Sequence, residues 1–371
     1  MKATYKIIST ILLSLILLSS FVSCKTKNNN IGTADKETVT VIDHLGYKVT
    51  VPKNIDRIVI GKIYPLPSVV SIFFDSAEKI VGMPQQCMTA AKNSILSELY
   101  PEILNAETDY INGANLNIEA LIELDPDVYI YNAADPGHGE LCRKAGIPAV
   151  AVAVNKWDYD AVLTLENWID LLSQIFPENK KSDIVSAYSE NVINIVNDRI
   201  KNADNFEREN IFFLYQYTDT MIATSGNKFF GQWWSDAVYA NNVGSAIDKD
   251  NSVNVNMEQI YQWNPECILI TNFTTATPET LYNDPKWSGI DAVKNKRVYK
   301  MPLGMYRSYT CGVDTPVTLL WIAKTVYPDV FEDIDIIEET KKYYKEVFGV
   351  ELTAKQAETI FSPSSNASAY Q

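Results

Sequence analysis

Two stretches of the chain show the same alternation of short apolar runs and segments with helical apolar spacing. Continuous apolar runs are typical of buried parallel strands, and in the first stretch they lie at 57–61, 79–83, 127–131 and 149–154. Helical spacing separates these runs, at 66–74, 118–124 and 140–145. A β-hairpin is predicted to precede them, because residues alternate at 38–43 and at 48–51 around the turn residues 44–47.

The second stretch repeats this pattern after a long helical segment. Strands are predicted at 210–217, 221–224, 266–271 and 297–301, and helices at 229–239, 316–326 and 336–347. Between the stretches, apolar residues recur at helical spacing from about 158 to 202, with a break at Pro177. This segment predicts one long helix preceded by a shorter one, which together form a stiff connection.

A pair of similar segments lies in the two stretches, offset by 139 residues. In each, an Asn suited to cap a helix is followed by a Glu two positions later and by a Pro nine positions later. The shared residues are Asn115, Asn117, Glu119 and Pro126 in the first segment, and Asn254, Asn256, Glu258 and Pro265 in the second. The pair indicates two similar lobes.

The predicted fold class is therefore α/β, with two mostly parallel α/β lobes bridged by one long helix and a ligand cleft between the lobes. The tail after Ser362 is small and polar, and we expect it to be disordered. The expected organisation is a signal peptide (1–23), a lipidated Cys with a tether (24–37), an N-terminal lobe (38–160), connecting helices (161–203), a C-terminal lobe (204–350), and a short helix with the disordered tail (351–371).

The first 24 residues have the features of a secretory signal peptide. Lys2 and Lys6 precede the apolar segment 7–22, and Ser23 precedes Cys24 in a sequence that resembles a bacterial lipobox. We therefore expect Cys24 to be lipidated and the protein to be anchored at the extracytoplasmic face of the cell membrane. The alternative, an uncleaved transmembrane anchor, is disfavoured because the apolar segment is short and carries polar residues.

The charge and the cysteine content argue against nucleic-acid binding and against a zinc or redox site. The chain has 32 Lys and Arg against 46 Asp and Glu, a formal net charge of −14, which argues against nucleic acid as a partner. Besides Cys24 there are four widely separated cysteines with no C-x-x-C pair, namely Cys87, Cys142, Cys267 and Cys311. They do not suggest a zinc or redox site, and both disulfides and buried free thiols remain open.

No common catalytic signature occurs in the sequence. The G-x-S-x-G, H-E-x-x-H, P-loop and dinucleotide motifs are absent, and the chain has two histidines. His44 is expected to be exposed in the hairpin turn, and His138 lies in a predicted loop after the strand at 127–131. We therefore predict no enzymatic activity, no cofactor and no metal site built by the chain.

Aromatic residues cluster after the strands of the second stretch, where open α/β sheets bind ligands. With one Arg among them, they suit a large, partly aromatic, anionic ligand. The candidate ligand-binding residues are Lys62, Tyr64 and Gln85 in the first stretch, and Tyr215, Tyr217, Trp233, Tyr306, Arg307 and Tyr309 in the second.

An ordered set of short motifs resembles the substrate-binding lipoproteins of ABC importers for iron–siderophore, haem and cobalamin, the helical-backbone class of periplasmic binding proteins. The resemblance covers about residues 38–350. The motifs are Asp43–Gly46, Pro52, Arg57–Val59, Lys79–Gly82, Asn117-x-Glu119, Pro126–Val128, Ala145–Val150, Asn256-x-Glu258, Leu320–Lys324 and Tyr327–Asp329.

The resemblance implies a monomer that delivers its ligand to an ABC permease and its ATPase, with one surface carboxylate of each lobe meeting the permease. Glu258 fits this role in the second lobe, and Glu140 in the first, with Glu119 as its alternative; each is otherwise a solvated acid at a helix end. The membrane is contacted through the lipid anchor alone.

The ligand itself is left open among several chemistries. A ferric siderophore is ranked first, molybdate or tungstate second, and a cobamide or haem third. Two other functions remain as alternatives: an extracytoplasmic enzyme on the same frame, or a sensor that has lost transport.

Overall fold

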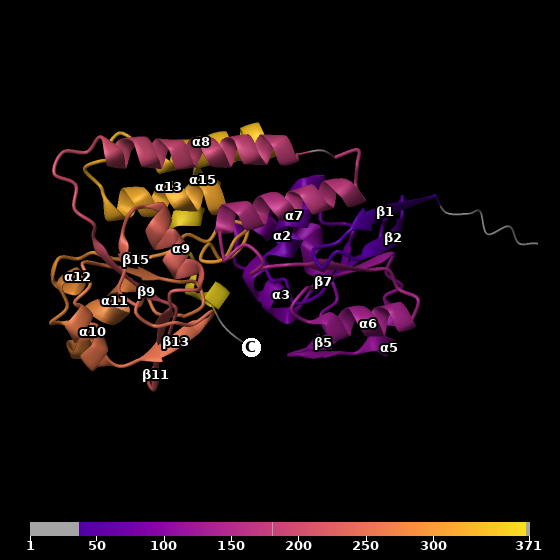
Figure 1. Ribbon diagram of the computed structural model, residues 1–371, viewed down its shortest axis with the longest axis horizontal. Helices are drawn as coiled ribbons and strands as arrows, with labels where there is room; N and C mark the ends of the chain where they lie inside the picture. The colour runs from indigo at the N-terminus through magenta and orange to yellow at the C-terminus, as the bar shows by residue number, and fades with distance from the viewer. Residues whose placement is uncertain (1–36, 180, 369–371) are drawn as a thin grey trace, which may run out of the picture. The chain divides into compact units, whose positions relative to one another are not determined.

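The computed structural model describes residues 37–179 and 181–368 (Figure 1). The predicted signal peptide, the lipidated Cys24 and the tether up to residue 36 lie outside the described residues. Within the described part of the chain, no helix is long and apolar enough to cross a membrane.

The first half of the described chain is built on a four-stranded parallel sheet. In spatial order its strands are β4 (Ile80–Gly82), β3 (Ile58–Ile60), β7 (Val128–Asn132) and β8 (Ala149–Val152). Ile58 lies opposite Val128, and Ile130 lies opposite Val150. The strands are almost wholly buried, as their continuous apolar sequences predict.

Shorter elements surround this sheet. The predicted hairpin is present as the antiparallel strands β1 (Thr38–Ile42) and β2 (Lys48–Pro52). The others are α2 (Leu66–Phe74), α3 (Gln85–Ala91), α4 (Ile95–Leu99), η1 (Pro101–Asn105), β5 (Ile111–Asn112), β6 (Asn115–Leu116), α5 (Ile118–Glu123) and α6 (Pro136–Lys144).

Two helices connect the halves, as the sequence predicts. They are α7 (Ala161–Ile175) and α8 (Ser182–Lys201), and α8 packs against α7 and against α13 (Thr315–Val326) (Figure 1). One face of α8 is buried at helical spacing, with Val185, Val192, Val196 and Ile200. The long connection is thus stabilised by packing along its length.

The second half holds another four-stranded parallel sheet. Its strands, in spatial order, are β12 (Asn241–Asn242), β9 (Asn210–Leu214), β14 (Cys267–Ile270) and β15 (Val298–Lys300). Ile268 lies opposite both Phe212 and Val298. Beside it is an antiparallel sheet of β10 (Gln216–Thr218), β11 (Met221–Ser225) and β13 (Ser252–Val255).

One predicted strand, 210–217, is divided at Tyr215. Residues up to Leu214 pair in the parallel sheet, whereas residues from Gln216 pair with β11. The backbone N–H of Tyr215 already donates to the carbonyl of Ala223, 2.8 Å away. The chain therefore changes hydrogen-bond partners at this residue, which a continuous apolar pattern does not reveal.

The remaining elements of the second half are α9 (Phe230–Ala237), α10 (Met257–Trp263), α11 (Pro278–Tyr282), η2 (Pro285–Trp287), α12 (Asp291–Lys294), α14 (Ile336–Tyr343), η3 (Tyr344–Phe348), α15 (Ala354–Phe361) and η4 (Ser365–Ser368). The turn η4 lies where we expected a disordered tail. Ala367 and Ser368 in it are buried, so the segment packs on the folded body.

The two similar segments take equivalent places in the fold. The Asn117 side chain accepts hydrogen bonds at the start of α5, and the Asn256 side chain does so at the start of α10. Each helix leads into a strand, β7 or β14, that is the third strand of its sheet in the spatial order given above. The internal repeat is therefore structural.

The four cysteines of the described chain are buried free thiols, which decides between the two alternatives left open by the sequence. Burial raises the pKa of Cys142 and of Cys267 to about 12, so these thiols stay protonated and unreactive at neutral pH.

Candidate ligand-binding site

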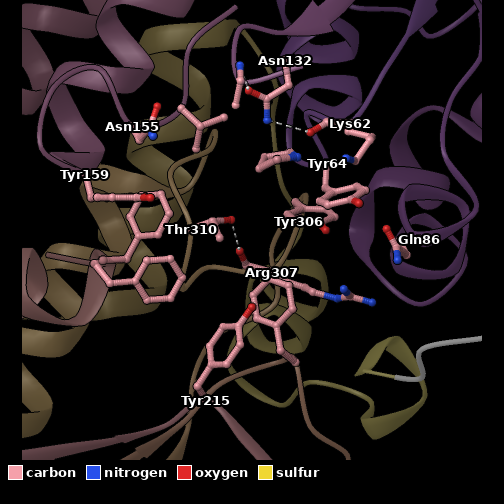
Figure 2. A pocket seen from close by; sticks show the side chains of 16 residues that line it. Lys62, Tyr64, Gln86, Asn132, Asn155, Tyr159, Tyr215, Tyr306, Arg307 and Thr310 are labelled. Atoms are coloured by element: carbon pink, nitrogen blue, oxygen red, sulfur yellow. Dashed lines mark hydrogen bonds between the residues drawn. The ribbon is translucent and has the colours of Figure 1, made fainter. Parts of the chain in front are cut away.

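A cavity of about 300 Å³ lies where loops of both halves meet (Figure 2). From the first half it is lined by Lys62, Tyr64, Pro65, Gln86, Asn132, Ala134, Val154, Asn155 and Tyr159. From the second half it is lined by Tyr215, Phe229, Phe230, Phe273, Tyr306, Arg307 and Thr310.

The carboxyl ends of parallel strands place many of these residues. Asn132 is the last residue of β7, Val154 and Asn155 follow β8, and Tyr215 follows β9. Phe273 comes three residues after β14. Ligands of open α/β sheets bind at this edge of the sheet, so the cavity lies where the topology predicts a ligand.

Aromatic rings form one continuous wall of the cavity. Tyr215 stacks on Phe273 with ring centroids 5.1 Å apart, and Phe229 meets Tyr215 edge-on at 5.7 Å. From the first half, Tyr159 meets Phe229 and Phe230 edge-on at 5.3 and 5.0 Å. Because Tyr159 contacts rings of the other half, the wall joins the two halves.

A buried tyrosine supports this wall from behind. The Tyr309 hydroxyl accepts a hydrogen bond from the backbone N–H of Gly231 at 3.0 Å, and the Tyr309 carbonyl accepts one from the Trp234 indole at 2.8 Å. Burial raises the pKa of Tyr309 above its ordinary value, so the ring stays neutral. Tyr309 thus fixes the start of α9 next to Phe229 and Phe230.

Lys62 supplies a positive charge on the first-half side. Its Nζ lies 3.2 Å from a carboxylate oxygen of Asp135, and its carbonyl accepts a hydrogen bond from the Asn132 amide. Both charged side chains are about one quarter exposed. The ion pair orients the ammonium at the cavity and balances part of its charge.

Arg307 supplies the second positive charge and is 1% exposed. Its Nε and Nη2 donate to the carbonyl of Ala367 at 3.1 and 2.7 Å. The guanidinium carbon lies 4.9 Å from the Phe273 ring and 5.7 Å from the Tyr306 ring. In Figure 2 the side chain extends toward the side of the cavity where Gln86 lies.

A third cation lies deeper in the second half. Lys300 donates to the carbonyls of Thr271 and Ala276, both at 2.9 Å, and to the carbonyl of Thr274. Burial, followed by the nearby charge of Arg307, lowers its pKa to about 7. Lys300 is therefore protonated only in part at neutral pH, and it adds a partial positive charge behind the aromatic wall.

A smaller polar annex of about 230 Å³ adjoins the cavity. It shares Lys62, Tyr64 and Gln86 with the cavity. Its further lining residues are Pro84, Gln85, Ile111, Asn112 and Gly113. The annex adds the amides of Gln85 and Asn112 to those of Gln86, Asn132 and Asn155 in the main cavity.

The structure brings together five of the nine predicted ligand-binding residues. Lys62, Tyr64, Tyr215, Tyr306 and Arg307 line the cavity, and Gln85 lines the annex.

The other three candidates do not line either space. Tyr217 donates to an Asp284 carboxylate oxygen at 2.8 Å, Trp233 packs edge-on against Trp234, and Tyr309 is fully buried. These side chains support the second half.

Several lining residues were missed by the sequence analysis. Asn132, Asn155 and Phe273 follow predicted strands, so the strand-end rule applied to every strand would have found them. Tyr159, Phe229 and Phe230 carry no such signal, because they reach the cavity through the connection into α7 and the start of α9.

The two histidines lie outside the cavity. The expectation that His44 is exposed is wrong, since its Nδ1 accepts a hydrogen bond from the Ala153 N–H and its ring meets Trp157 edge-on at 5.0 Å. His138 is a buried residue of α6 and contacts the Tyr129 hydroxyl. Among the described residues no group of three or more His, Cys, Asp or Glu could hold a metal ion.

The three candidate docking acids are exposed on helices away from the cavity lining. Glu119 and Glu258 occupy the second helical position of α5 and α10, respectively. Glu140 lies in the middle of α6.

Comparisons with known proteins agree with this architecture. Residues 77–303 match the sequence profile of the family described as periplasmic binding protein. The molybdate-binding protein MolA of Haemophilus influenzae is 27% identical over 332 residues, which cover 83% of this chain and 90% of that protein.

Solved structures show the same fold. A periplasmic solute-binding protein from Veillonella parvula is 27% identical with a TM-score of 0.77, over 88% of this chain and 97% of that chain. CeuE of Helicobacter pylori is 23% identical with a TM-score of 0.68, over 88% and 99%. The two-lobed α/β fold, the bridging helices and the family match together show that the chain belongs to the periplasmic binding protein family, the substrate-binding components of ABC transporters.

Proposed function

We propose that this protein captures a metal chelate, with a ferric siderophore as the first candidate, in the cavity between its halves. The observation that carries the proposal is the aromatic lining of a cavity of about 300 Å³. This volume lies at the lower end of the roughly 300–1,000 Å³ typical of pockets for organic ligands. The rings would contact the organic surface of a chelate, which brings its own metal ligands.

The charges around the cavity support a ligand with net negative charge. Lys62 and Arg307 line the cavity, and Lys300 lies behind it. A desolvated guanidinium and ammonium favour carboxylate, catecholate or hydroxamate oxygens. The amides of Gln86, Asn132 and Asn155 add groups that can fix the orientation of such a ligand.

Molybdate is the second candidate, because the similar protein from Haemophilus influenzae is named for molybdate binding. A single tetrahedral oxyanion would fill only part of this cavity and would leave water against the aromatic wall. An oxyanion makes no apolar contact with the aromatic rings, whereas the organic part of a chelate does, so we rank the chelate first.

The test is a panel of ligands on purified residues 25–371. Thermal melting and tryptophan fluorescence would be recorded with ferric hydroxamate and catecholate siderophores, haem, cobalamin, molybdate and tungstate. A ligand at 100 times its Kd stabilises the fold by about 2.7 kcal/mol. A rise of the melting temperature with a ferric chelate supports the proposal. A rise with molybdate or tungstate alone replaces the proposal by the second candidate.

Two tyrosines provide a matched pair for locating the site. Tyr215 lines the cavity, whereas Tyr217 is bonded to Asp284 outside it. We expect Tyr215→Ala to weaken binding of the chelate at least about tenfold, because a ring of the wall is lost. Tyr217→Ala should leave affinity unchanged, and equal losses in both variants would contradict the assignment of the cavity.

We also propose that Cys24 is lipidated and holds the protein at the extracytoplasmic face of the membrane. The support is the lipobox-like sequence before Cys24. Cys24→Ser should move the protein from the membrane fraction to the soluble fraction and abolish acylation, as read by mass spectrometry. Unchanged membrane association would refute the anchor.

A further inference from the structure

The segment that follows α15 turns back onto the folded body at the edge of the cavity. Residues 365–368 form the short turn η4, in which Ala367 is fully buried and Ser368 is 2% exposed. The turn packs against α3, the helix that carries Gln85 and Gln86. Residues with small side chains make this close packing feasible.

The same turn is hydrogen-bonded to Arg307, one of the two cationic residues that line the cavity. The carbonyl of Ala367 accepts hydrogen bonds from both Nε and Nη2 of Arg307. Arg307 belongs to the second half and α3 to the first, so the turn contacts elements of both halves next to the ligand site.

These contacts offset the cost of burying the guanidinium. A buried charge without acceptors is strongly unfavourable and would turn toward water instead. The two hydrogen bonds to Ala367 and the rings of Phe273 and Tyr306 hold the guanidinium in the cavity wall. The turn thus orients Arg307 through a neutral carbonyl, whereas Asp135 orients Lys62 and also balances part of its charge.

We propose that Ala367, in the turn at residues 365–368, acts on the ligand site: its carbonyl positions Arg307 and thereby gives the cavity its preference for anionic ligands. The proposal rests on the cavity being the ligand site, as proposed above. Arg307 is the residue that meets the ligand, and Ala367 is a positioning residue that acts through it.

Two variants one residue apart test the proposal. Ala367 has no room for a larger side chain, whereas Asn366 is exposed. Ala367→Leu should dislodge the turn without changing charge, and Asn366→Leu adds the same side chain at the surface. A chain shortened to end at Ser362 removes the turn altogether.

The first measurement is charge selectivity with two ferric probes. Dislodging the turn should weaken binding of an anionic ferric tris-catecholate about tenfold or more and leave an uncharged ferric tris-hydroxamate within twofold. Asn366→Leu should match the unaltered protein with both probes. Equal weakening of both probes by Ala367→Leu would indicate a merely structural role and would overturn the proposal, as would unchanged binding of both.

The second measurement needs no ligand. Amide hydrogen exchange at residues 305–310 should quicken in Ala367→Leu and in the shortened chain, but not in Asn366→Leu. If the unaltered protein binds neither probe, the proposed function has failed for ferric chelates, and the exchange data still decide whether the turn positions Arg307. Unchanged exchange in both altered chains would overturn the positioning role.

Discussion

Arg307 carries a positive charge although its side chain is almost completely buried, and burying a charge is energetically unfavourable. It is 1% exposed and lies near Lys300, whose pKa is lowered to about 7 by burial and by the Arg307 charge. The protein offsets the two charges with backbone carbonyls, since both side chains donate to them. The positive charge of these side chains lies in or next to the cavity wall and favours an anionic ligand there.

The partial burial of His44 leads us to expect that acid destabilises the fold. Burial, followed by the charge of Lys156, lowers its pKa from 6.5 to about 4, while Asp43 and Asp170 oppose the shift. The neutral ring accepts a hydrogen bond from the Ala153 N–H, and a proton at Nδ1 would abolish it. Ala153 leads into the cavity residues Val154 and Asn155, so this bond also fixes part of the site.

We therefore predict that the free energy of unfolding falls between pH 6.5 and pH 4. In that window the unfolded chain binds a proton at His44 that the folded chain does not, and the effect is on the order of 3 kcal/mol. His44→Gln should flatten this part of the profile, measured by urea unfolding at stepped pH. An unchanged slope in the variant would show that other groups cause the acid loss.

The sequence identified some cavity residues that follow strands, but it missed others and every residue at the start of α9. Lys62 and Tyr64 follow β3 and Tyr215 follows β9, so the alternation of apolar runs was enough to place them at the carboxyl edges of the two parallel sheets. Tyr217 also follows β9, yet it belongs to β10 and points its hydroxyl at Asp284. The change of sheet at Tyr215 depends on the hairpin that β10 forms with β11, and the continuous apolar run 210–217 does not show where that hairpin begins.

At the scale of elements, close packing between α9 and β11 holds the aromatic wall in place. A Cβ added at Gly231 would lie 2.5 Å from the Ser225 Cβ and 2.9 Å from a ring atom of Phe213. The backbone N–H of Gly231 also donates to Tyr309. Phe230 immediately precedes Gly231, so any shift of α9 moves a cavity residue.

We predict that Gly231→Ala lowers stability by about 1–3 kcal/mol through overpacking and weakens ligand binding. Gly137 in α6 is the matched control, because a Cβ there meets nothing within 4 Å. Gly137→Ala should stabilise the protein by about 0.5 kcal/mol, since alanine favours the helix. Thermal melting of both variants checks the contrast, and similar stabilities would contradict the close packing.

The repeat is the element-level feature that the sequence predicted best. The Asn caps, the following helices and the strands β7 and β14 all take equivalent places. Local capping and apolar runs determine these elements, so they can be read from a single chain. The antiparallel sheet and the turn η4 could not be predicted in the same way, because packing against distant residues defines them.

At the scale of the whole molecule, the repeat bears on how the protein meets its permease. Glu119 and Glu258 occupy the same position in α5 and α10, and both are exposed. Glu140, the first-lobe acid that the resemblance favoured, has no counterpart at that position of the repeat. A transporter with two similar halves would meet two equivalent carboxylates most directly, so we expect Glu119 to be the partner of Glu258.

We predict that Glu119→Ala combined with Glu258→Ala abolishes ligand uptake in cells while the purified double variant keeps its affinity for the ligand. Removing a carboxylate from a charge pair at an interface costs about 2–5 kcal/mol, so two losses would be decisive for docking. Glu140→Ala combined with Glu258→Ala is the control and should retain part of the uptake, because one equivalent contact survives. If the control abolishes uptake and the first pair does not, Glu140 is the docking residue and the symmetry argument fails. Uptake that survives in both pairs would exclude Glu258 as well, and the permease would then have to recognise a different surface of the two lobes.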